Sequence, residues 1–126
     1  MKNINLKTYL KGELPAPNQE NIELISLISS IADATISIAK DTRITGLKNI
    51  RGSANKINIQ GEEVKILDEI SNNKLINILS KNPYCAGYAS EEIKDPKMFN
   101  SSSRFMVVAD PLDGSGNISV NMPIGT

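Results

Sequence analysis

Two carboxylates stand three residues apart in a segment rich in small residues, Asp110-Pro111-Leu112-Asp113-Gly114-Ser115-Gly116-Asn117. The apolar run before it, residues 105–109, predicts a buried strand that delivers Asp110 to the end of a sheet. Pro111 turns the chain out of the sheet, so that Asp113 can fold back toward Asp110. Two carboxylates at one point repel each other unless a cation lies between them. The alternative interpretation is an ordinary turn, for which Asp-Gly supplies only the turn chemistry.

Backbone groups of the same turn add to the predicted site. The carbonyl group of Leu112 has left the predicted sheet and is free to bind a cation. The N–H groups of Gly114, Ser115 and Gly116 can form a nest that binds an anion. Oxygen ligands beside such a nest are typical of a Mg²⁺–phosphate site.

Three more acidic residues can reach the same place. Glu91 and Glu92 follow a second predicted strand, residues 84–89, and share the edge with Asp110 if that strand lies beside 105–109. Asp68 falls inside the apolar stripe of a predicted helix, where a carboxylate is costly unless paired or coordinated. Acids from separate segments are what a two- or three-metal phosphoryl-transfer site requires. The alternatives are surface acids for Glu91 and Glu92 and, for Asp68, a position at the stripe edge that reaches water.

Hydrophobic periodicity predicts the elements that position these residues. The expected helices span 4–11, 19–40 (with Asn18 as N-cap) and 62–80; the expected strands span 84–89, 105–109 (a central strand) and 118–124, with a loop over 94–103. Residues 42–61 are punctuated by glycines and carry basic but no acidic residues. This pattern favours a solvated loop, with a basic flap over an anionic ligand as the alternative. The elements indicate an α+β fold with helices packed on a mixed or antiparallel sheet.

Composition narrows the chemistry further. The 126 residues include 14 Lys+Arg and 14 Asp+Glu, a balance that argues against nucleic acid as a partner. With Cys85 as the one cysteine and no histidine, the chain has no internal disulfide and no catalytic His, so a metal site needs oxygen ligands. No window approaches the ~20 apolar residues of a membrane span. The sequence therefore predicts a soluble, cytoplasmic protein with no membrane partner.

The segment Asp110–Asn117 resembles the signature of the class 1 fructose-1,6-bisphosphatases, in the superfamily of metal-dependent, lithium-sensitive sugar and inositol phosphatases. Three other segments match in the same order: Gly61-Glu-Glu-Val-Lys-Ile-Leu-Asp68, Ala86-Gly-Tyr-Ala-Ser-Glu-Glu92 and Val120-Asn-Met-Pro-Ile-Gly-Thr126. Members of that family are well over twice as long. The resemblance therefore implies that residues 1–126 are the N-terminal portion of the layered sugar-phosphatase fold, with the C-terminal half absent and no activity alone.

The resemblance also implies a role for each site residue. The metal ligands are the side chains of Glu91, Asp110 and Asp113 and the main-chain oxygen of Leu112. Asp68 takes the place of the carboxylate that activates the attacking water, with Glu92 assisting, and Gly114 and Ser115 hold a substrate phosphate. The 42–61 stretch corresponds to a mobile loop that closes over the active site. Three positions depart from the family pattern: Glu62 replaces a usual Asp near the metals, Gly116 a Ser and Ser119 an Asp.

The implied reaction is Mg²⁺-dependent hydrolysis of the 1-phosphate of fructose 1,6-bisphosphate, which gives fructose 6-phosphate and phosphate in gluconeogenesis. Mn²⁺ can substitute for Mg²⁺, and the implied full-length form is a homo-oligomer, a tetramer. One alternative is another phosphatase of the superfamily, acting on sedoheptulose bisphosphate, inositol monophosphate or a 3′-phosphonucleotide. The other is a non-catalytic metal-binding fragment.

Overall fold

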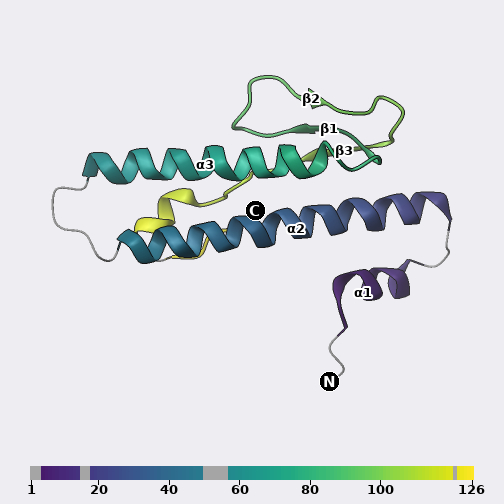
Figure 1. Cartoon of the computed structure of the whole chain (residues 1–126), viewed down its shortest axis with the longest axis horizontal. Helices are drawn as coiled ribbons and strands as arrows, with labels where there is room; N and C mark the ends of the chain where they lie inside the picture. The colour runs from purple at the N-terminus through teal and green to yellow at the C-terminus, as the bar shows by residue number, and fades with distance from the viewer. Residues whose placement is uncertain (1–3, 15–17, 50–56, 121) are drawn as a thin grey trace.

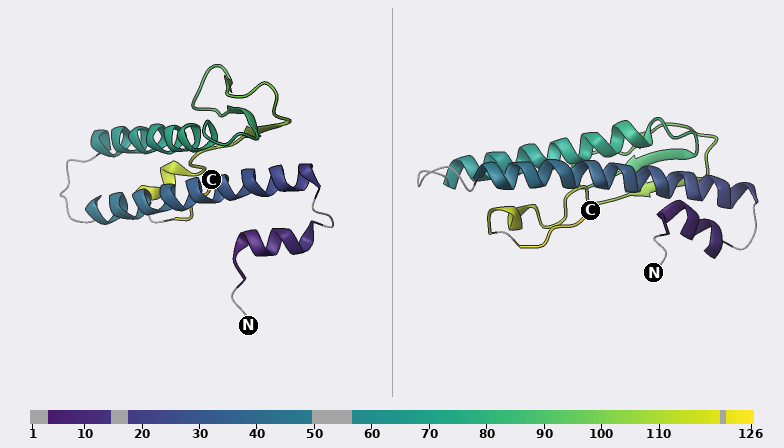
Figure 2. Two further views of the ribbon diagram at one scale, coloured as in Figure 1. Left: turned by 45° about the vertical axis from the view of Figure 1, so that its right-hand side comes forward. Right: turned by 60° about the horizontal axis from the view of Figure 1, so that its bottom comes forward.

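The computed structural model describes residues 4–14, 18–49, 57–120 and 122–126, without the side chains of 45–49, 57–65 and 118–120. Its elements, in chain order, are α1 (Leu6–Glu13), α2 (Gln19–Asn49), α3 (Ile57–Leu79), β1 (Cys85–Ala89), β2 (Lys97–Met98), β3 (Phe105–Val108) and the 3₁₀ helix η1 (Ser115–Val120). The long helices α2 and α3 lie side by side and antiparallel, with the sheet over the C-terminal half of α3 (Figure 1). The segment after β3 returns beneath the two helices, where η1 contacts both (Figure 2). The predicted α+β fold is confirmed.

The pairing of α2 with α3 forms most of the core. As predicted, Asn18 caps α2, because its Oδ1 accepts a hydrogen bond of 2.8 Å from the N–H of Asn21. The apolar stripes of both helices face each other and the sheet, as their periodicity requires. The buried cluster comprises Leu27, Ala34, Ile38, Leu67, Leu75, Leu79, Cys85, Tyr88, Val107 and Leu112.

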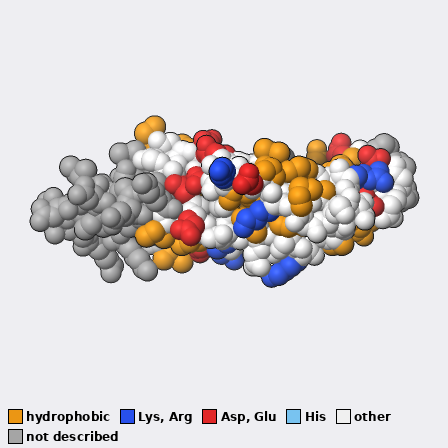
Figure 3. Space-filling view, turned by 90° about the horizontal axis from the view of Figure 1, so that it is seen from above, with side chains coloured by type: hydrophobic (Ala, Val, Ile, Leu, Met, Phe, Trp, Pro, Cys, Tyr) orange, Lys and Arg blue, Asp and Glu red, His pale blue; other side chains and the backbone are white. Residues whose placement is uncertain are grey.

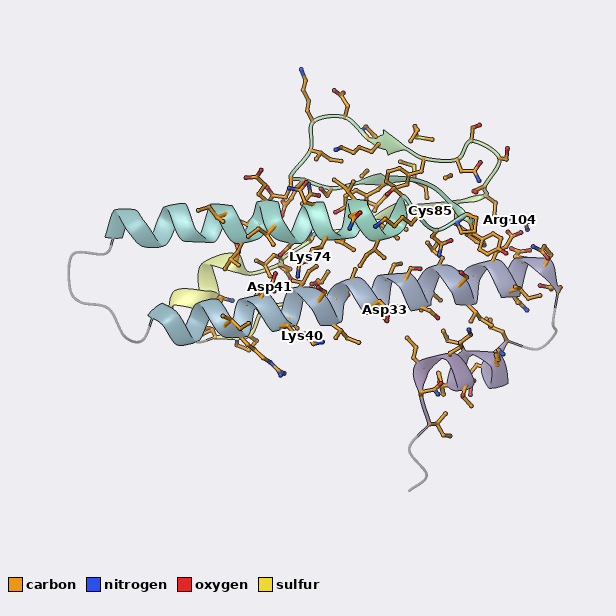
Figure 4. The ribbon with its side chains drawn as sticks, in the orientation of Figure 1. Asp33, Lys40, Asp41, Lys74, Cys85 and Arg104 are labelled. Atoms are coloured by element: carbon orange, nitrogen blue, oxygen red, sulfur yellow. The ribbon has the colours of Figure 1, made fainter. Side chains whose placement is uncertain are left out.

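Both long helices extend further than predicted, so the interpretation of 42–61 as one loop or flap is wrong. α2 continues to Asn49 and α3 begins at Ile57; residues 50–56 lie outside the described part. A contact with α3 holds α2 at the point where it passes residue 40. Lys74 Nζ on α3 lies 2.6 Å from Asp41 Oδ2 on α2 (Figure 4). It also lies 2.7 Å from Ser37 Oγ on the same helix. Gly46 lies within the extended part of α2. A glycine inside a helix costs only about 1 kcal/mol relative to alanine, so it does not end the helix.

The sheet is mixed, with the strand order β2-β1-β3. β1 pairs in parallel with β3 (Tyr88 opposite Val107) and antiparallel with β2 (Tyr88 opposite Lys97). Two strand predictions are wrong and one loop prediction needs correction. Within the described residues β3 is an edge strand with Met106 and Val108 exposed, residues 115–120 form η1 in place of a strand at 118–124, and the predicted loop 94–103 contains β2.

The segment Gln19–Ile44 of α2 is long and apolar enough to cross a membrane by length and composition, with a mean hydropathy of 1.6. This corrects the expectation that no window approaches a membrane span. One such helix is weak evidence for a membrane, since the core helix of a soluble protein passes the same test; 22% of the apolar window is buried. In this structure Leu27, Ala34 and Ile38 of α2 lie in the core. Packing against the core therefore accounts for the apolar residues on that face of the helix.

Gly87 allows β1 and β2 to approach closely. A Cβ atom at this position would lie 2.7 Å from the carbonyl oxygen of Lys97 and 3.0 Å from Met98 Sδ. The backbone oxygen cannot move without opening the strand pair. We therefore expect Gly87→Ala to lower the free energy of unfolding by about 1–3 kcal/mol, as overpacking does, in urea denaturation followed by circular dichroism.

The matched control for this change is Gly12→Ala in α1, where an added Cβ meets nothing within 4 Å. We expect that variant to be as stable as the wild type or slightly more stable, because alanine favours the helix. Coincident unfolding curves for Gly87→Ala and the wild type would contradict the close approach of β1 and β2.

Candidate active site

The parallel pairing of β1 and β3 brings two groups of carboxylates to one edge of the sheet. The N–H of Ala109 donates a 3.1 Å hydrogen bond to the carbonyl of Ala89, which continues the pairing to the ends of both strands. Beyond this point β1 leads to Glu91 and Glu92, and β3 leads to Asp110. The strands predicted at 84–89 and 105–109 are therefore adjacent. The prediction that Glu91 and Glu92 share a sheet edge with Asp110 required this.

The turn after β3 has a fixed shape. Asp110 Oδ1 accepts a 3.0 Å hydrogen bond from the N–H of Leu112, which folds the chain back at Pro111. The side chains of Pro111 and Leu112 are buried, so they anchor the turn to the core. Gly114 has a φ of 75°, a left-handed conformation that side chains disfavour. The turn thus presents the Asp113 side chain, which is exposed, and leads directly into η1.

The last residues of the chain fasten this turn. The N–H of Gly125 donates to the carbonyl of Asp113 at 2.9 Å, and the Thr126 hydroxyl donates to the carbonyl of Pro111 at 3.2 Å. Asn117 Nδ2 donates to the carbonyl of Pro123 at 2.9 Å. Two hydrogen bonds therefore link residues 125–126 to the turn and a third links Pro123 to η1, although the sequence predicted a strand over 118–124.

The carboxyl group of Glu91 lies near the negative charges of Asp110, Glu92 and Asp113. The charge of Asp110 raises the pKa of the Glu91 carboxyl, and partial desolvation, a hydrogen bond with Asp110 and the charges of Glu92 and Asp113 raise it further. Every one of these interactions favours the protonated form. Carboxylates from both strand ends and from the turn are thus close enough to disfavour the ionisation of Glu91.

Asp68 reaches the same region from α3. Burial raises the pKa of its carboxyl, a hydrogen bond from the Ser115 hydroxyl lowers it, and the charge of Asp110 raises it again, with a net upward shift. A carboxylate with a raised pKa is a stronger base than an ordinary aspartate. Asp68 also adjoins Ser115, which the sequence assigned to phosphate binding.

A cavity of about 530 Å³ opens beside Asp68. It lies between α3 and the segment after β1, and its lining consists of Asp68, Glu69, Asn72, Asn73, Glu92, Ile93 and Lys97. The predicted base and its predicted assistant, Asp68 and Glu92, therefore share one cavity. On the face seen from above, acidic side chains gather in the middle, with a few basic ones among them and a hydrophobic patch beside them (Figure 3).

The donors suit a hard divalent cation in chemistry, although the side chains are not arranged around one. The carboxylates of Glu91, Asp110 and Asp113 and the Leu112 carbonyl are all oxygen donors, which Mg²⁺ and Mn²⁺ prefer. Their mutual repulsion at Glu91 is what a cation would relieve. Among the described residues, no three acidic or cysteine side chains are close enough together to hold an ion. The side chain of Glu62 lies outside the described part.

Sequence reasoning did not identify a buried polar network beside these carboxylates. Asn72 Oδ1 accepts hydrogen bonds from the Tyr88 hydroxyl at 3.1 Å and the Ser90 hydroxyl at 2.9 Å. The signal for it was present, because Asn72 lies one helical turn after Asp68 on the same face of α3. An amide in an apolar stripe requires partners as much as a carboxylate does.

Comparisons with known proteins identify the family of this chain. Residues 8–126 match the profile of the family described as "Fructose-1-6-bisphosphatase, N-terminal domain". A class 1 fructose-1,6-bisphosphatase from Sulfurihydrogenibium sp. (strain YO3AOP1) is 48% identical over 120 residues, covering 93% of this chain and 36% of the relative. The class 1 enzyme of Psychrobacter sp. (strain PRwf-1) is 44% identical over 122 residues, covering 97% of this chain and 36% of the relative.

A solved structure shares the fold. The holo form of Leishmania major fructose-1,6-bisphosphatase superposes with a TM-score of 0.73 at 25% identity, covering 98% of this chain and 36% of that structure. The fold is thus that of an α+β sugar phosphatase with acidic residues at the ends of parallel strands. The chain belongs to the fructose-1,6-bisphosphatase family, as the resemblance implied. It spans about a third of the length of the relatives it matches.

Proposed function

We propose that this chain contributes the metal and catalytic carboxylates of a Mg²⁺-dependent phosphatase that releases the 1-phosphate of fructose 1,6-bisphosphate. The observation that carries the proposal is the parallel pairing of β1 with β3, which brings Glu91 and Asp110 to one edge of the sheet. Membership of the fructose-1,6-bisphosphatase family supports the substrate. Residues 1–126 then act as the N-terminal portion of a larger phosphatase domain.

The roles follow from the positions of the side chains. Glu91, Asp110 and Asp113, with the carbonyl of Leu112, would hold the cation, since they form an all-oxygen set at one sheet edge. Glu91 and Asp113 are exposed, so their side chains can rotate into a closer arrangement. A bound divalent cation supplies neutralisation of the phosphate charge and acidification of a water molecule. Mn²⁺, with the same preference for oxygen, substitutes for Mg²⁺.

The remaining residues bind the phosphate and move a proton. The left-handed Gly114 turns the chain so that the backbone at Gly114 and Ser115 can hold a phosphate oxygen. Asp68 accepts the proton of the attacking water, and Glu92 in the same cavity assists. As the oxygen of that water bonds to phosphorus, the bond from phosphorus to the sugar oxygen breaks. The leaving oxygen takes a proton from solvent water, and Asp68 returns its proton to the solvent. The products are fructose 6-phosphate and inorganic phosphate.

The setting of the reaction is part of the same proposal. The active protein is a homo-oligomer, a tetramer, in the cytoplasm, where it serves gluconeogenesis. The free cysteine, Cys85, which is buried, is compatible with a reducing compartment. Relatives that carry the class 1 fructose-1,6-bisphosphatase name support the pathway assignment.

Phosphate release tests the proposal. The chain is joined to the part of a class 1 relative that it does not match, and the joined protein is assayed with Mg²⁺. We expect saturable release from fructose 1,6-bisphosphate, with a higher kcat/KM than for sedoheptulose bisphosphate, inositol monophosphate or a 3′-phosphonucleotide. A preference for one of the other substrates would instead identify another phosphatase of the superfamily.

The chain by itself provides the second arm of the assay. We expect residues 1–126 alone to release phosphate at the background rate, since they hold a third of the length of their relatives. Turnover above ~1 s⁻¹, the low end for enzymes, would contradict this expectation. Cation binding by a joined protein that hydrolyses none of these substrates would favour a non-catalytic metal-binding role.

A further inference from the structure

Asn72 connects the helix that carries Asp68 to the turn that carries Glu91 and Glu92. The Asn72 side chain is buried, with 5% of its surface exposed, and its Oδ1 accepts hydrogen bonds from the hydroxyls of Tyr88 and Ser90. Tyr88 lies in β1 and is fully buried, and Ser90 directly precedes Glu91. One amide oxygen therefore ties α3 to the chain on both sides of the end of β1.

We propose that Asn72 is a positioning residue that, through Ser90, fixes Glu91 and Glu92 relative to Asp68. The proposal rests on the function proposed above for these carboxylates. Asp68 and Asn72 are four residues apart on α3, a rise of about 6 Å along one face of the helix. Because both lie on the same rigid helix, anchoring Ser90 to Asn72 also sets the distance from the turn to Asp68. Asn72 and Asp68 line the same cavity as Glu92.

Apart from Ile93, which packs against the core, and the hydrogen bond of Glu91 with Asp110, few contacts hold the turn. Its own backbone hydrogen bond, from the N–H of Ile93 to the carbonyl of Ser90, is long at 3.3 Å. The side chains of Glu91 and Glu92 are exposed, so packing does not fix them. Among the contacts of the described residues, the Ser90 hydroxyl bond is thus the side-chain link between this turn and α3.

An asparagine suits this position because it accepts two hydrogen bonds without adding a charge. A carboxylate could accept the same two bonds, but it would add a negative charge where Asp68, Glu92 and Asp110 already lie. The charges of Asp110 and Glu92 already act on the Tyr88 hydroxyl. A buried neutral acceptor fastens the turn while leaving the charge of the site to the carboxylates.

Hydrogen exchange tests the anchoring without any metal. Asn72→Leu removes the acceptor at similar volume, Ser90→Ala removes the donor, and Ser90→Thr keeps a hydroxyl. We expect the amides of Glu91, Glu92 and Ile93 to exchange about 10-fold faster in Asn72→Leu and Ser90→Ala, relative to the core amide of Val107. In Ser90→Thr we expect wild-type exchange. Should Asn72→Leu fail to fold, the two Ser90 variants carry the comparison.

A matched control comes from a second buried amide. Asn82, 7% exposed, also joins two hydroxyls, because its Nδ2 donates to Ser26 Oγ at 3.3 Å and Ser30 Oγ at 2.8 Å. It ties α2 to the chain before β1, at the other end of that strand from the carboxylates. Asn82→Leu removes these two bonds and the one that Asn82 Oδ1 accepts from the N–H of Tyr84. We expect it to leave the relative exchange of residues 91–93 unchanged.

Mn²⁺ binding to the same chains, followed by electron paramagnetic resonance, tests the consequence for the site. We expect Asn72→Leu and Ser90→Ala to bind Mn²⁺ about 10–100-fold more weakly, as loss of groups that orient metal ligands does, and Ser90→Thr to bind as the wild type does. Equal affinity in all four chains would overturn the positioning role. A wild type that binds no Mn²⁺ would overturn the metal site instead, and unchanged exchange at residues 91–93 would then overturn the positioning role independently.

Discussion

Replacement of Asp68 by asparagine is expected to lower phosphatase turnover by about 10²–10⁴-fold, the range for loss of a general acid–base group. Asparagine keeps the shape of the side chain and can still accept the hydrogen bond from Ser115, but it cannot take a proton from water. The measurement is kcat for fructose 1,6-bisphosphate with Mg²⁺, in the chain joined to the remainder of a class 1 relative. Because the change is in proton transfer, we expect KM to move far less than kcat.

Asp33→Asn provides the control for this variant. Asp33 is an exposed carboxylate on α2, and its side chain points away from α3 (Figure 4), so the same chemical change there should leave kcat as in the wild type. The circular dichroism spectrum of Asp68→Asn should match that of the wild type. Its unfolding midpoint should differ only by the effect of removing one partly buried charge. Wild-type turnover in Asp68→Asn would return Asp68 to the alternative role of a carboxylate at the edge of an apolar stripe.

Local patterns predicted where the three helices and the strands β1 and β3 lie, because the information for these elements lies in neighbouring residues. The stripe from Leu27 to Ile38 and the cap at Asn18 needed only helical spacing and one short polar side chain. The run 105–109 was apolar enough to be recognised as a strand. The Asp110–Asp113 spacing predicted a turn that folds back, and the parallel β1–β3 pair places that turn beside Glu91.

The failures occurred where distant contacts decide the outcome. Lys74, on another helix, binds Asp41 where α2 continues beyond the predicted end at residue 40, and no local pattern predicts that partner. The exposure of Val108, at 77%, depends on which strands lie beside β3. Asn72 was not predicted because its hydrogen-bond partners, Tyr88 and Ser90, are 16 and 18 residues away in the sequence.

The charge of Asp113 provides the most direct test of the proposed cation site. Asp113→Asn removes one negative charge and leaves the turn intact. The hydrogen bond that fastens the turn here runs from the N–H of Gly125 to the backbone carbonyl of Asp113, so the side chain takes no part in it. Calorimetry on the folded chain should show Mg²⁺ or Mn²⁺ binding in the wild type. We expect Asp113→Asn to weaken the binding of the cation by about 10–100-fold or more. Loss of a residue that only orients a metal ligand already costs that much affinity.

Asp95→Asn separates this effect from a general loss of negative charge. Asp95 is exposed and follows the same turn as Glu91 and Glu92, but its charge is not among those that raise the pKa of Glu91, whereas that of Asp113 is. If the cation binds where the carboxylates repel each other, Asp95→Asn should retain wild-type affinity while Asp113→Asn loses it. Equal weakening in both variants would indicate a diffuse attraction to the acidic surface, and equal retention would remove Asp113 from the site. Only a site centred on Glu91, Asp110 and Asp113 predicts that the two substitutions differ.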